Sequence, residues 1–234
     1  MVKSRDPAAV EALFNAVAPR YDRLNDLLSL GLHRQWKRQV LAWLSPQSGE
    51  SWLDLCCGTG DLALALARKV RPQGSVLGLD AASAPLAVAS ERSSREPWLP
   101  VQWLQADALA TGLPGQGFDG LVMAYGLRNL ADPCLGFKEM ARLLRPGGRA
   151  AILDFNRLPQ GSAGAAFQRT YLRRVVVPVA SQLGLKDQYA YLEPSLEQFL
   201  TGAEQEDQAI ANGFVAAQHR SLVAGQMGVL LLVR

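Results

Sequence analysis

The chain has 234 residues, of which 49% are hydrophobic and 19% are charged, which is typical of a globular protein with an ample core. Its formal net charge of +3 is too small by itself to indicate a nucleic-acid partner, and we expect none. No apolar run is long enough to span a bilayer, and the first residues do not form a signal peptide. The three cysteines form neither a disulfide framework nor a zinc spacing, so we expect no metal site and a cytoplasmic location.

The first 45 residues have a helical pattern with an interruption. Val10, Leu13, Phe14 and Val17 are spaced like the apolar face of a helix, which should end before Pro19.

In residues 21–36 leucines alternate with polar side chains. We interpret the leucines and Trp36 as core residues, whereas Tyr21, Asp22 and Asn25 are candidates for chemistry because a helix would bring them within one turn of each other. A hydrogen-bonded structural role and a ligand role both stay open for His33.

Residues 52–61 have the pattern of a buried strand, a tight turn and the start of a helix. The strand is Trp52 to Leu55, and Gly58, Thr59 and Gly60 form the turn. Such a turn places free backbone N–H groups and a positive helix dipole beside a ligand. We interpret the adjacent Cys56 and Cys57 as small apolar residues beneath the turn.

Acidic residues stand at the ends of three predicted strands. Asp54 lies inside the end of the first strand, where it could face a cationic aminoacyl group. Asp80 ends the apolar run 76–79 and could accept hydrogen bonds from both hydroxyls of a ribose. Asp107 and Ala108 follow the strand 101–104, where an adenine edge would lie. Three acids suit a sulfonium and an ammonium better than a pyrophosphate, so S-adenosylmethionine is favoured over NAD.

The middle of the chain alternates strands with helices. A helix should begin at Ser83, as its N-cap, and run to residues 90–92; the strand 118–124, the helix 135–144 and the strand 149–155 follow. This alternation predicts an α/β fold with a doubly wound, mostly parallel sheet.

Ligands bind at the carboxyl edge of such a sheet, so the residues that follow each strand are candidate site residues. Ala124 ends the fourth strand and is expected to contact the cofactor. Arg128 follows as the one basic residue of an apolar stretch. Asp154 ends the fifth strand, and capping of the next helix is its alternative role.

Residues 157–202 depart from the alternation and predict helical insertions that, together with the N-terminal helices, roof the site. A helix at 204–211 and an antiparallel pair at 214–222 and 227–233 should close the sheet. We expect one domain made of an N-terminal helical cap (1–47), a cofactor-binding core (48–156), a cap insertion (157–202) and a closing helix and hairpin (203–234).

Two segments carry a family resemblance. Residues 21–36, Tyr-Asp-x-Leu-Asn-x-x-Leu-Ser-x-x-x-His-x-x-Trp, and residues 142–149 with 154–156 resemble signatures of the C-methyltransferases that methylate quinone rings in menaquinone, ubiquinone and phylloquinone biosynthesis. Leu24 stands where methionine is commoner in that family. The similarity covers nearly the whole chain and implies a Rossmann-like class I methyltransferase fold, S-adenosyl-L-methionine as cofactor, and a prenylated naphthoquinol as substrate.

Within that family the similarity is closest to the members that methylate 2-phytyl-1,4-naphthoquinol, and demethylmenaquinol is the alternative because its ring is identical. The resemblance implicates Arg128 in catalysis. An arginine is always protonated, so we expect it to pair with the phenolate and not to act as the base. Tyr21, Asp22 or a water relayed by Asp154 are the candidate proton acceptors.

Other classes of function stay open on the residues alone. Residues 58–63 satisfy the relaxed dinucleotide fingerprint, so a nicotinamide oxidoreductase is one alternative, and a non-catalytic nucleoside-binding scaffold is another. The oligomeric state is also open, with a homodimer as one option.

A phytyl or prenyl tail stays in a bilayer, so we expect transient, peripheral membrane contact. The N-terminal segment mixes apolar and basic residues suited to an interface: Leu27, Leu28, Leu30, Leu32, Trp36 and Trp43 beside Arg34, Lys37 and Arg38. A buried amphipathic helix with a solvated basic face is the alternative.

Overall fold

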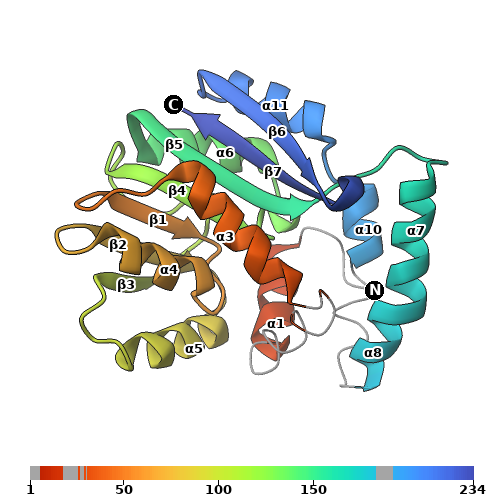
Figure 1. Cartoon of the computed structure of the whole chain (residues 1–234), viewed down its shortest axis with the longest axis horizontal. Coiled ribbons are helices and arrows are strands. Elements are labelled where there is room, and N and C mark those ends of the chain that lie inside the picture. Colours follow the sequence, from red (N-terminus) through yellow and green to blue (C-terminus); the bar gives the residue numbers. More distant parts are fainter. Residues whose placement is uncertain (1–5, 18–25, 27–28, 30, 183–191) are drawn as a thin grey trace.

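The computed structural model describes residues 6–17, 26, 29, 31–182 and 192–234. Seven strands form one sheet in the order β3-β2-β1-β4-β5-β7-β6 (Figure 1). The strands are β1 Ser51–Leu55, β2 Ser75–Asp80, β3 Val101–Gln105, β4 Phe118–Ala124, β5 Leu144–Phe155, β6 Ala216–Leu222 and β7 Met227–Val233. Strands β1 to β5 are parallel, whereas β7 runs antiparallel to both β5 and β6. The predicted doubly wound sheet and its closing antiparallel pair are therefore confirmed.

Helices cover both faces of this sheet. The α-helices are α1 Pro7–Val17, α3 Leu32–Leu44, α4 Asp61–Val70, α5 Ser83–Ser94, α6 Pro133–Leu143, α7 Ala163–Tyr171, α8 Val177–Gln182, α10 Leu192–Glu197 and α11 Gly202–Ala211. A π-helix, η3 Leu172–Val176, joins α7 to α8. Two short 3-10 helices are η2 Leu127–Asn129 and η4 Val223–Gly225. Within the described residues, no helix is long and apolar enough to cross a bilayer.

The core has two apolar layers because the central strands are buried on both faces. Trp52 of β1 and Val122 of β4 pack with α3 and α4 in one layer. Leu53 and Leu121, one residue along each strand, pack with α6 and α11 in the other. Successive strand residues point to opposite faces, so continuous apolar runs fill both layers.

Helix α5 begins differently from the prediction. Its N-cap is Ala82, and Ser83 is already helical and makes no side-chain cap, so the predicted Ser83 cap was wrong. The Asn15 Oδ1 of α1 instead accepts a hydrogen bond from the Ala84 N–H at 2.9 Å. A free N–H at the helix start is thus satisfied by a distant helix.

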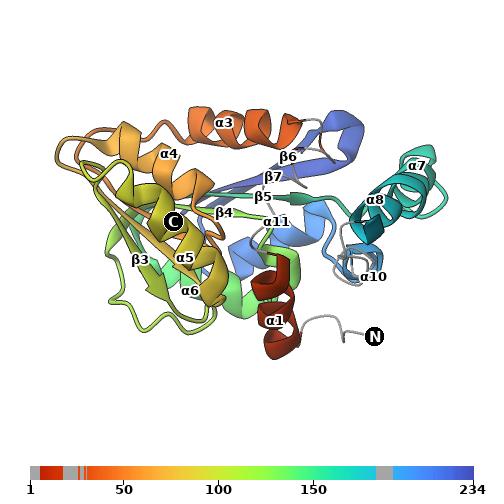
Figure 2. The same cartoon turned by 90° about the horizontal axis from the view of Figure 1, so that it is seen from below.

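Helix α1 and the insertion after β5 share a third apolar cluster. Leu172, Val176 and Ala180 are buried there, and Leu13 and Phe14 of α1 pack against them. Figure 2 shows α1, α8 and α10 on the same side of the molecule. Within the described residues, α1 and the insertion therefore pack on each other through one apolar cluster.

Candidate active site

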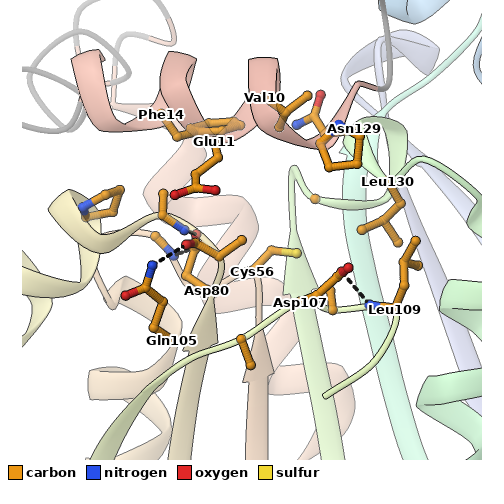
Figure 3. Close-up of a pocket in the computed structure, with 18 of the residues that line it drawn as sticks. Val10, Glu11, Phe14, Cys56, Asp80, Gln105, Asp107, Leu109, Asn129 and Leu130 are labelled. Carbon is orange, nitrogen blue, oxygen red and sulfur yellow. Dashed lines mark hydrogen bonds between the residues drawn. The ribbon is translucent and has the colours of Figure 1, made fainter. Parts of the chain in front are cut away.

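A cavity of about 550 Å³ lies at the carboxyl ends of the parallel strands, beneath α1 (Figure 3). Its lining includes six residues that the sequence predicts for the cofactor: Gly58, Thr59, Asp80, Asp107, Ala108 and Ala124. Helix α1 adds Val10, Glu11 and Phe14 from above. The topology thus brings together residues more than a hundred positions apart.

The glycine turn has the geometry that the sequence predicts. Gly60 is the N-cap of α4 with φ of 83°, and a Cβ there would lie 2.5 Å from the ring of Trp103. Gly58 has φ of 54°, and a Cβ on it would meet no atom within 4 Å. A side chain at position 60 would therefore clash, whereas one at position 58 would be strained by its backbone conformation and would occupy open space.

Asp80 links this turn to the end of β2. Its Oδ2 accepts a hydrogen bond from the Gly58 N–H at 2.8 Å, and its Oδ1 accepts one from the Ala82 N–H at 2.9 Å. Burial raises the pKa of the Asp80 carboxyl, these N–H donors oppose the rise, and the nearby Glu11 adds to it. Each oxygen keeps a lone pair, so this carboxylate can accept further hydrogen bonds from a ligand in the cavity.

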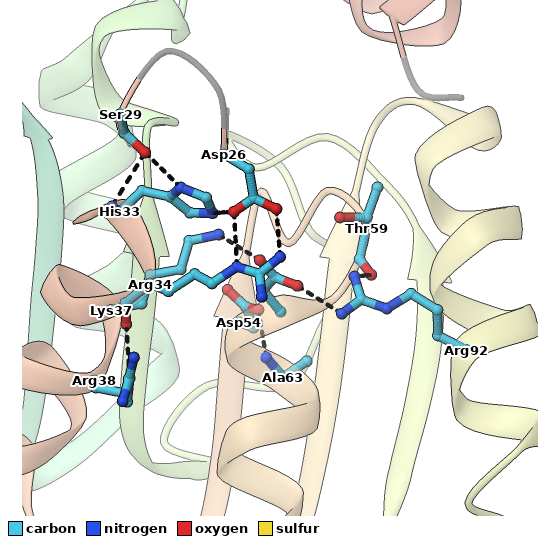
Figure 4. Close-up of polar contacts among 11 residues, drawn as sticks. Asp26, Ser29, His33, Arg34, Lys37, Arg38, Asp54, Thr59, Ala63 and Arg92 are labelled. Carbon is cyan, nitrogen blue, oxygen red and sulfur yellow. Dashed lines mark hydrogen bonds and ion pairs between the residues drawn. The ribbon is translucent and has the colours of Figure 1, made fainter. Parts of the chain in front are cut away.

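Asp54 lies beneath the turn and is not part of the cavity lining. Its Oδ2 accepts a hydrogen bond from the Ala63 N–H at 2.8 Å, in the first turn of α4 (Figure 4). Burial raises the pKa of Asp54 to about 8. The side chain therefore braces the turn, and its contact with an aminoacyl group stays a prediction.

A second carboxylate, Asp61 at the start of α4, is paired with cations from two other helices. Lys37 of α3 and Arg92 of α5 pair with it at 2.9 and 2.7 Å, and the Arg92 Nη1 also donates to the Thr59 carbonyl at 2.9 Å. Although burial alone would raise the pKa of Asp61, the two cations lower it below its usual range. This network fixes the turn between two helices.

Arg128 and Asp154, which the sequence predicts as two separate site residues, form an ion pair in the structure. The Arg128 Nη1 lies 2.6 Å from the Asp154 Oδ1, and both side chains are buried. The Arg128 guanidinium also lies 5.4 Å from the centre of the Phe155 ring and donates to the Tyr125 carbonyl at 3.0 Å. Neither Arg128 nor Asp154 lines the cavity, but Tyr125 does, so the pair lies directly behind its wall.

Tyr125 and Asn129 are site residues that the sequence did not predict, although Ala124 and Arg128 of the same segment were candidates. Tyr125 has φ of 62°, a strained conformation that is concentrated at functional sites. Its carbonyl also accepts a hydrogen bond from the Asn129 Nδ2 at 2.9 Å. The Asn129 Oδ1 is buried and has no hydrogen-bond partner in the part of the chain that the structure describes. Both residues line the cavity.

Other predicted residues have different outcomes. Tyr21, Asp22 and Asn25 lie outside the described residues. His33 is buried in α3 with its Nδ1 2.8 Å from the Ser29 Oγ, which favours the structural role. Cys57 is buried as expected, whereas Cys56 lines the cavity and so does not lie beneath the turn.

The charge of the cavity is one-sided. Glu11, Asp80 and Asp107 line it, and no lysine, arginine or histidine is among the described lining residues. Nothing in the sequence marks Glu11 as a site residue, because α1 reaches the cavity only through the fold. A cationic ligand with hydroxyl donors suits this lining, and a pyrophosphate does not.

Comparison with known proteins decides between the classes of enzyme that the sequence left open. The ubiE/COQ5 methyltransferase family matches residues 1–231. The chain belongs to this family. It is therefore an S-adenosylmethionine-dependent C-methyltransferase, and the oxidoreductase alternative is set aside.

Two named proteins are similar to this methyltransferase in sequence, and one solved structure is similar in fold. A protein of Nostoc punctiforme, "2-phytyl-1,4-naphtoquinone methyltransferase", is 47% identical over 224 residues, which are 95% of this chain and 97% of that protein. A chloroplastic protein of Arabidopsis thaliana, "2-phytyl-1,4-beta-naphthoquinone methyltransferase", is 45% identical over 95% of this chain and 86% of that protein. A solved methyltransferase of Thermotoga maritima has a TM-score of 0.67 at 17% identity, covering 95% and 98% of the two chains, and so shares the fold.

Proposed function

We propose that this enzyme methylates a ring carbon of a reduced naphthoquinone, 2-phytyl-1,4-naphthoquinol. The observation that carries the proposal is a cavity whose described lining holds acids and no cation, backed by the buried Arg128–Asp154 pair. The substrate class rests on relatives that are 45–47% identical over nearly the full chain.

The cavity residues fit S-adenosylmethionine. Asp80 has lone pairs left for the ribose hydroxyls, Asp107 and Ala108 would lie beside the adenine, and the turn at 58–60 leaves room for the aminoacyl chain. The bound cofactor supplies an electrophilic methyl group. Glu11 adds negative charge above it, which favours a sulfonium.

Carbon methylation demands little acid–base machinery. A deprotonated quinol hydroxyl raises the electron density of the neighbouring ring carbon, and that carbon forms the new bond to the methyl group while its own hydrogen leaves as a proton. The protein has to hold the ring, exclude water and stabilise the phenolate. Helix α1 lies over the cavity, where it would limit the access of water to the methyl group.

Arg128 would stabilise the phenolate from behind the wall of the cavity, and Asp154 is its positioning residue. The carboxylate accepts hydrogen bonds from the Arg128 Nη1, the Arg128 N–H and the Phe155 N–H, at 2.6, 3.3 and 2.9 Å. These three hydrogen bonds engage both oxygens of Asp154 in holding Arg128 and the backbone. Tyr21 and Asp22 therefore remain the better candidates for the proton acceptor.

The substrate tail adds a requirement. A phytyl chain partitions into a bilayer, so the enzyme meets its substrate at a membrane surface.

The test is turnover with purified enzyme. We expect methyl transfer to 2-phytyl-1,4-naphthoquinol only when a reductant keeps the ring as the quinol, because the electron-poor quinone carbon does not attack a sulfonium. Mass spectrometry of the product, with demethylmenaquinol in a parallel reaction, measures the preference for the tail. Methylation of the oxidised quinone, or no methylation of either quinol, would refute the proposal.

A further inference from the structure

Residues 163–182 form one helical segment, α7, η3 and α8, with two different faces. Leu172, Val176 and Ala180 are buried on its inner face. Phe167 and Val175 are 61% and 39% exposed on its outer face. Large apolar side chains on an outer helix face suit an interface.

This segment is also basic. Residues 155–182 contain four arginines and no aspartate or glutamate. Arg173 is paired with Glu193 at 2.7 Å. Arg169 and Arg174 are exposed and form no ion pair within the described residues. The outer face therefore carries uncompensated positive charge beside exposed apolar side chains.

The segment lies between the site and the outside of the molecule. Figures 1 and 2 show α7 and α8 at the edge remote from α4 and α5. On the inner side, Leu172 belongs to the cluster that also contains Phe155, and Phe155 lies against Arg128. An apolar layer thus runs from the wall of the site to the underside of this helix.

Helix α3 belongs to the N-terminal segment for which the sequence leaves both membrane contact and burial open. Trp36 and Trp43 are partly buried against the core, and Lys37 is paired with Asp61. Arg34 is paired with Asp26. Leu27, Leu28 and Leu30 lie outside the described residues. The described part of α3 therefore matches the alternative of a buried amphipathic helix.

We propose that the exposed surface of residues 163–182, with Phe167, Arg169, Arg174 and Val175, rests on an anionic lipid bilayer. The inference rests on the proposed function, since the substrate tail has to reach the site from a membrane. Phe167 and Val175 would enter the boundary between headgroups and acyl chains, and the two arginines would lie among lipid phosphates. The cluster of Leu172 and its neighbours then offers the tail an apolar route to Phe155.

Vesicle flotation tests the surface. The full-length protein is mixed with phosphatidylcholine vesicles that contain or lack phosphatidylglycerol. We expect R169Q/R174Q to weaken binding to the anionic vesicles about 25-fold, from roughly 1 kcal/mol for each arginine. F167S/V175S should weaken it about 10-fold or more. Salt at about 1 M, where the Debye length is roughly 3 Å, should remove most of the arginine contribution.

Two matched variants control for the chemistry that is removed. Trp98 is 58% exposed on another part of the surface, so W98S removes an exposed apolar side chain elsewhere. R34Q/R38Q removes two arginines from α3. Both controls should bind the vesicles like the unaltered protein. If R34Q/R38Q weakens binding as much as R169Q/R174Q does, α3 contributes equally to the membrane contact and the inference is overturned.

Separate readouts distinguish this inference from the proposed function. Turnover of 2-phytyl-1,4-naphthoquinol dispersed in detergent, without vesicles, should be the same in the face variants and the unaltered enzyme. Absence of that turnover in every preparation would refute the function, whatever the flotation result. Intact turnover with equal flotation of all variants would refute the surface. Changed self-association in place of changed flotation would assign the face to a second copy and also refute it.

Discussion

The Arg128–Asp154 pair makes the sharpest prediction, because it joins stability to catalysis. The two side chains are 7% and 3% exposed. Replacing one partner leaves the other as an unpaired buried charge, which costs about 3–5 kcal/mol out of a typical 5–15 kcal/mol of unfolding free energy. R128M, which keeps much of the volume, should therefore lower the urea midpoint strongly, and so should D154N.

The double variant R128M/D154N separates the two roles. It removes both charges, while the amide oxygen introduced at position 154 can still accept one of the two backbone hydrogen bonds that Asp154 accepts now, from the Arg128 N–H or from the Phe155 N–H. Its loss of unfolding free energy should be clearly smaller than the sum of the two single losses. Its single-turnover rate should nevertheless stay about 10²-fold or more below that of the unaltered enzyme, as after loss of an oxyanion donor.

Urea titration, single-turnover rates and calorimetry with S-adenosylhomocysteine are measured on the same preparations. Affinity for the cofactor product should be unchanged, because neither side chain lines the cavity. If the double variant regains the rate together with stability, Arg128 serves only the structure and the proposed role is wrong. R128K should keep part of the rate but lose the planar two-point geometry.

Three further predictions concern the cofactor side of the site. D80N keeps the shape of the Asp80 side chain but loses its charge, and it should weaken S-adenosylhomocysteine binding by about 1.5–3 kcal/mol in calorimetry; unchanged affinity would contradict the ribose assignment. For Asp54, burial raises the folded pKa from its usual 3.8 to about 8, so the free energy of unfolding should fall as pH rises from about 4 to about 8, by up to about 1.4 kcal/mol per pH unit; urea titrations should show a smaller fall in D54N, and an equal fall would refute the assignment. R92A should weaken cofactor binding because the Arg92 side chain donates to the Thr59 carbonyl in the glycine turn. R95A removes only an exposed ion pair at the end of the same helix and should not weaken it. Equal losses of cofactor affinity in the two variants would contradict the role of Arg92 in holding the turn.

Much of the fold follows from the sequence because the strands are continuous apolar runs bounded by glycine, proline and acids. The strand 118–124 is found without error, β1 begins one residue earlier than predicted, and β2 is one residue longer at each end. The exception is β5, which begins at Leu144 and not at Arg149. Pro146, Gly147 and Gly148 indicate a loop, yet their backbone continues into the sheet. Local composition cannot show that pairing.

The residues of the site could also be predicted only in part. Strand-end acids such as Asp80 are predictable, since the carboxyl ends of parallel strands share one edge. The direction of each side chain is not: Asp54 turns inward to the Ala63 N–H, although it stands near the same edge. Glu11 was missed because only tertiary packing brings α1 over the cavity, and Asn129 was missed because a neutral amide beside a charged arginine carries no signal of its own.

The distribution of charge explains why this cavity suits a methyl donor. Each cation described near the site is already paired inside the protein: Lys37 and Arg92 with Asp61, and Arg128 with Asp154. The carboxylates Glu11, Asp80 and Asp107 remain toward the cavity. A sulfonium that enters therefore meets a negative field, and the thioether left after methyl transfer has lost the charge that this field attracts. The same arrangement that binds the donor thus favours release of its product.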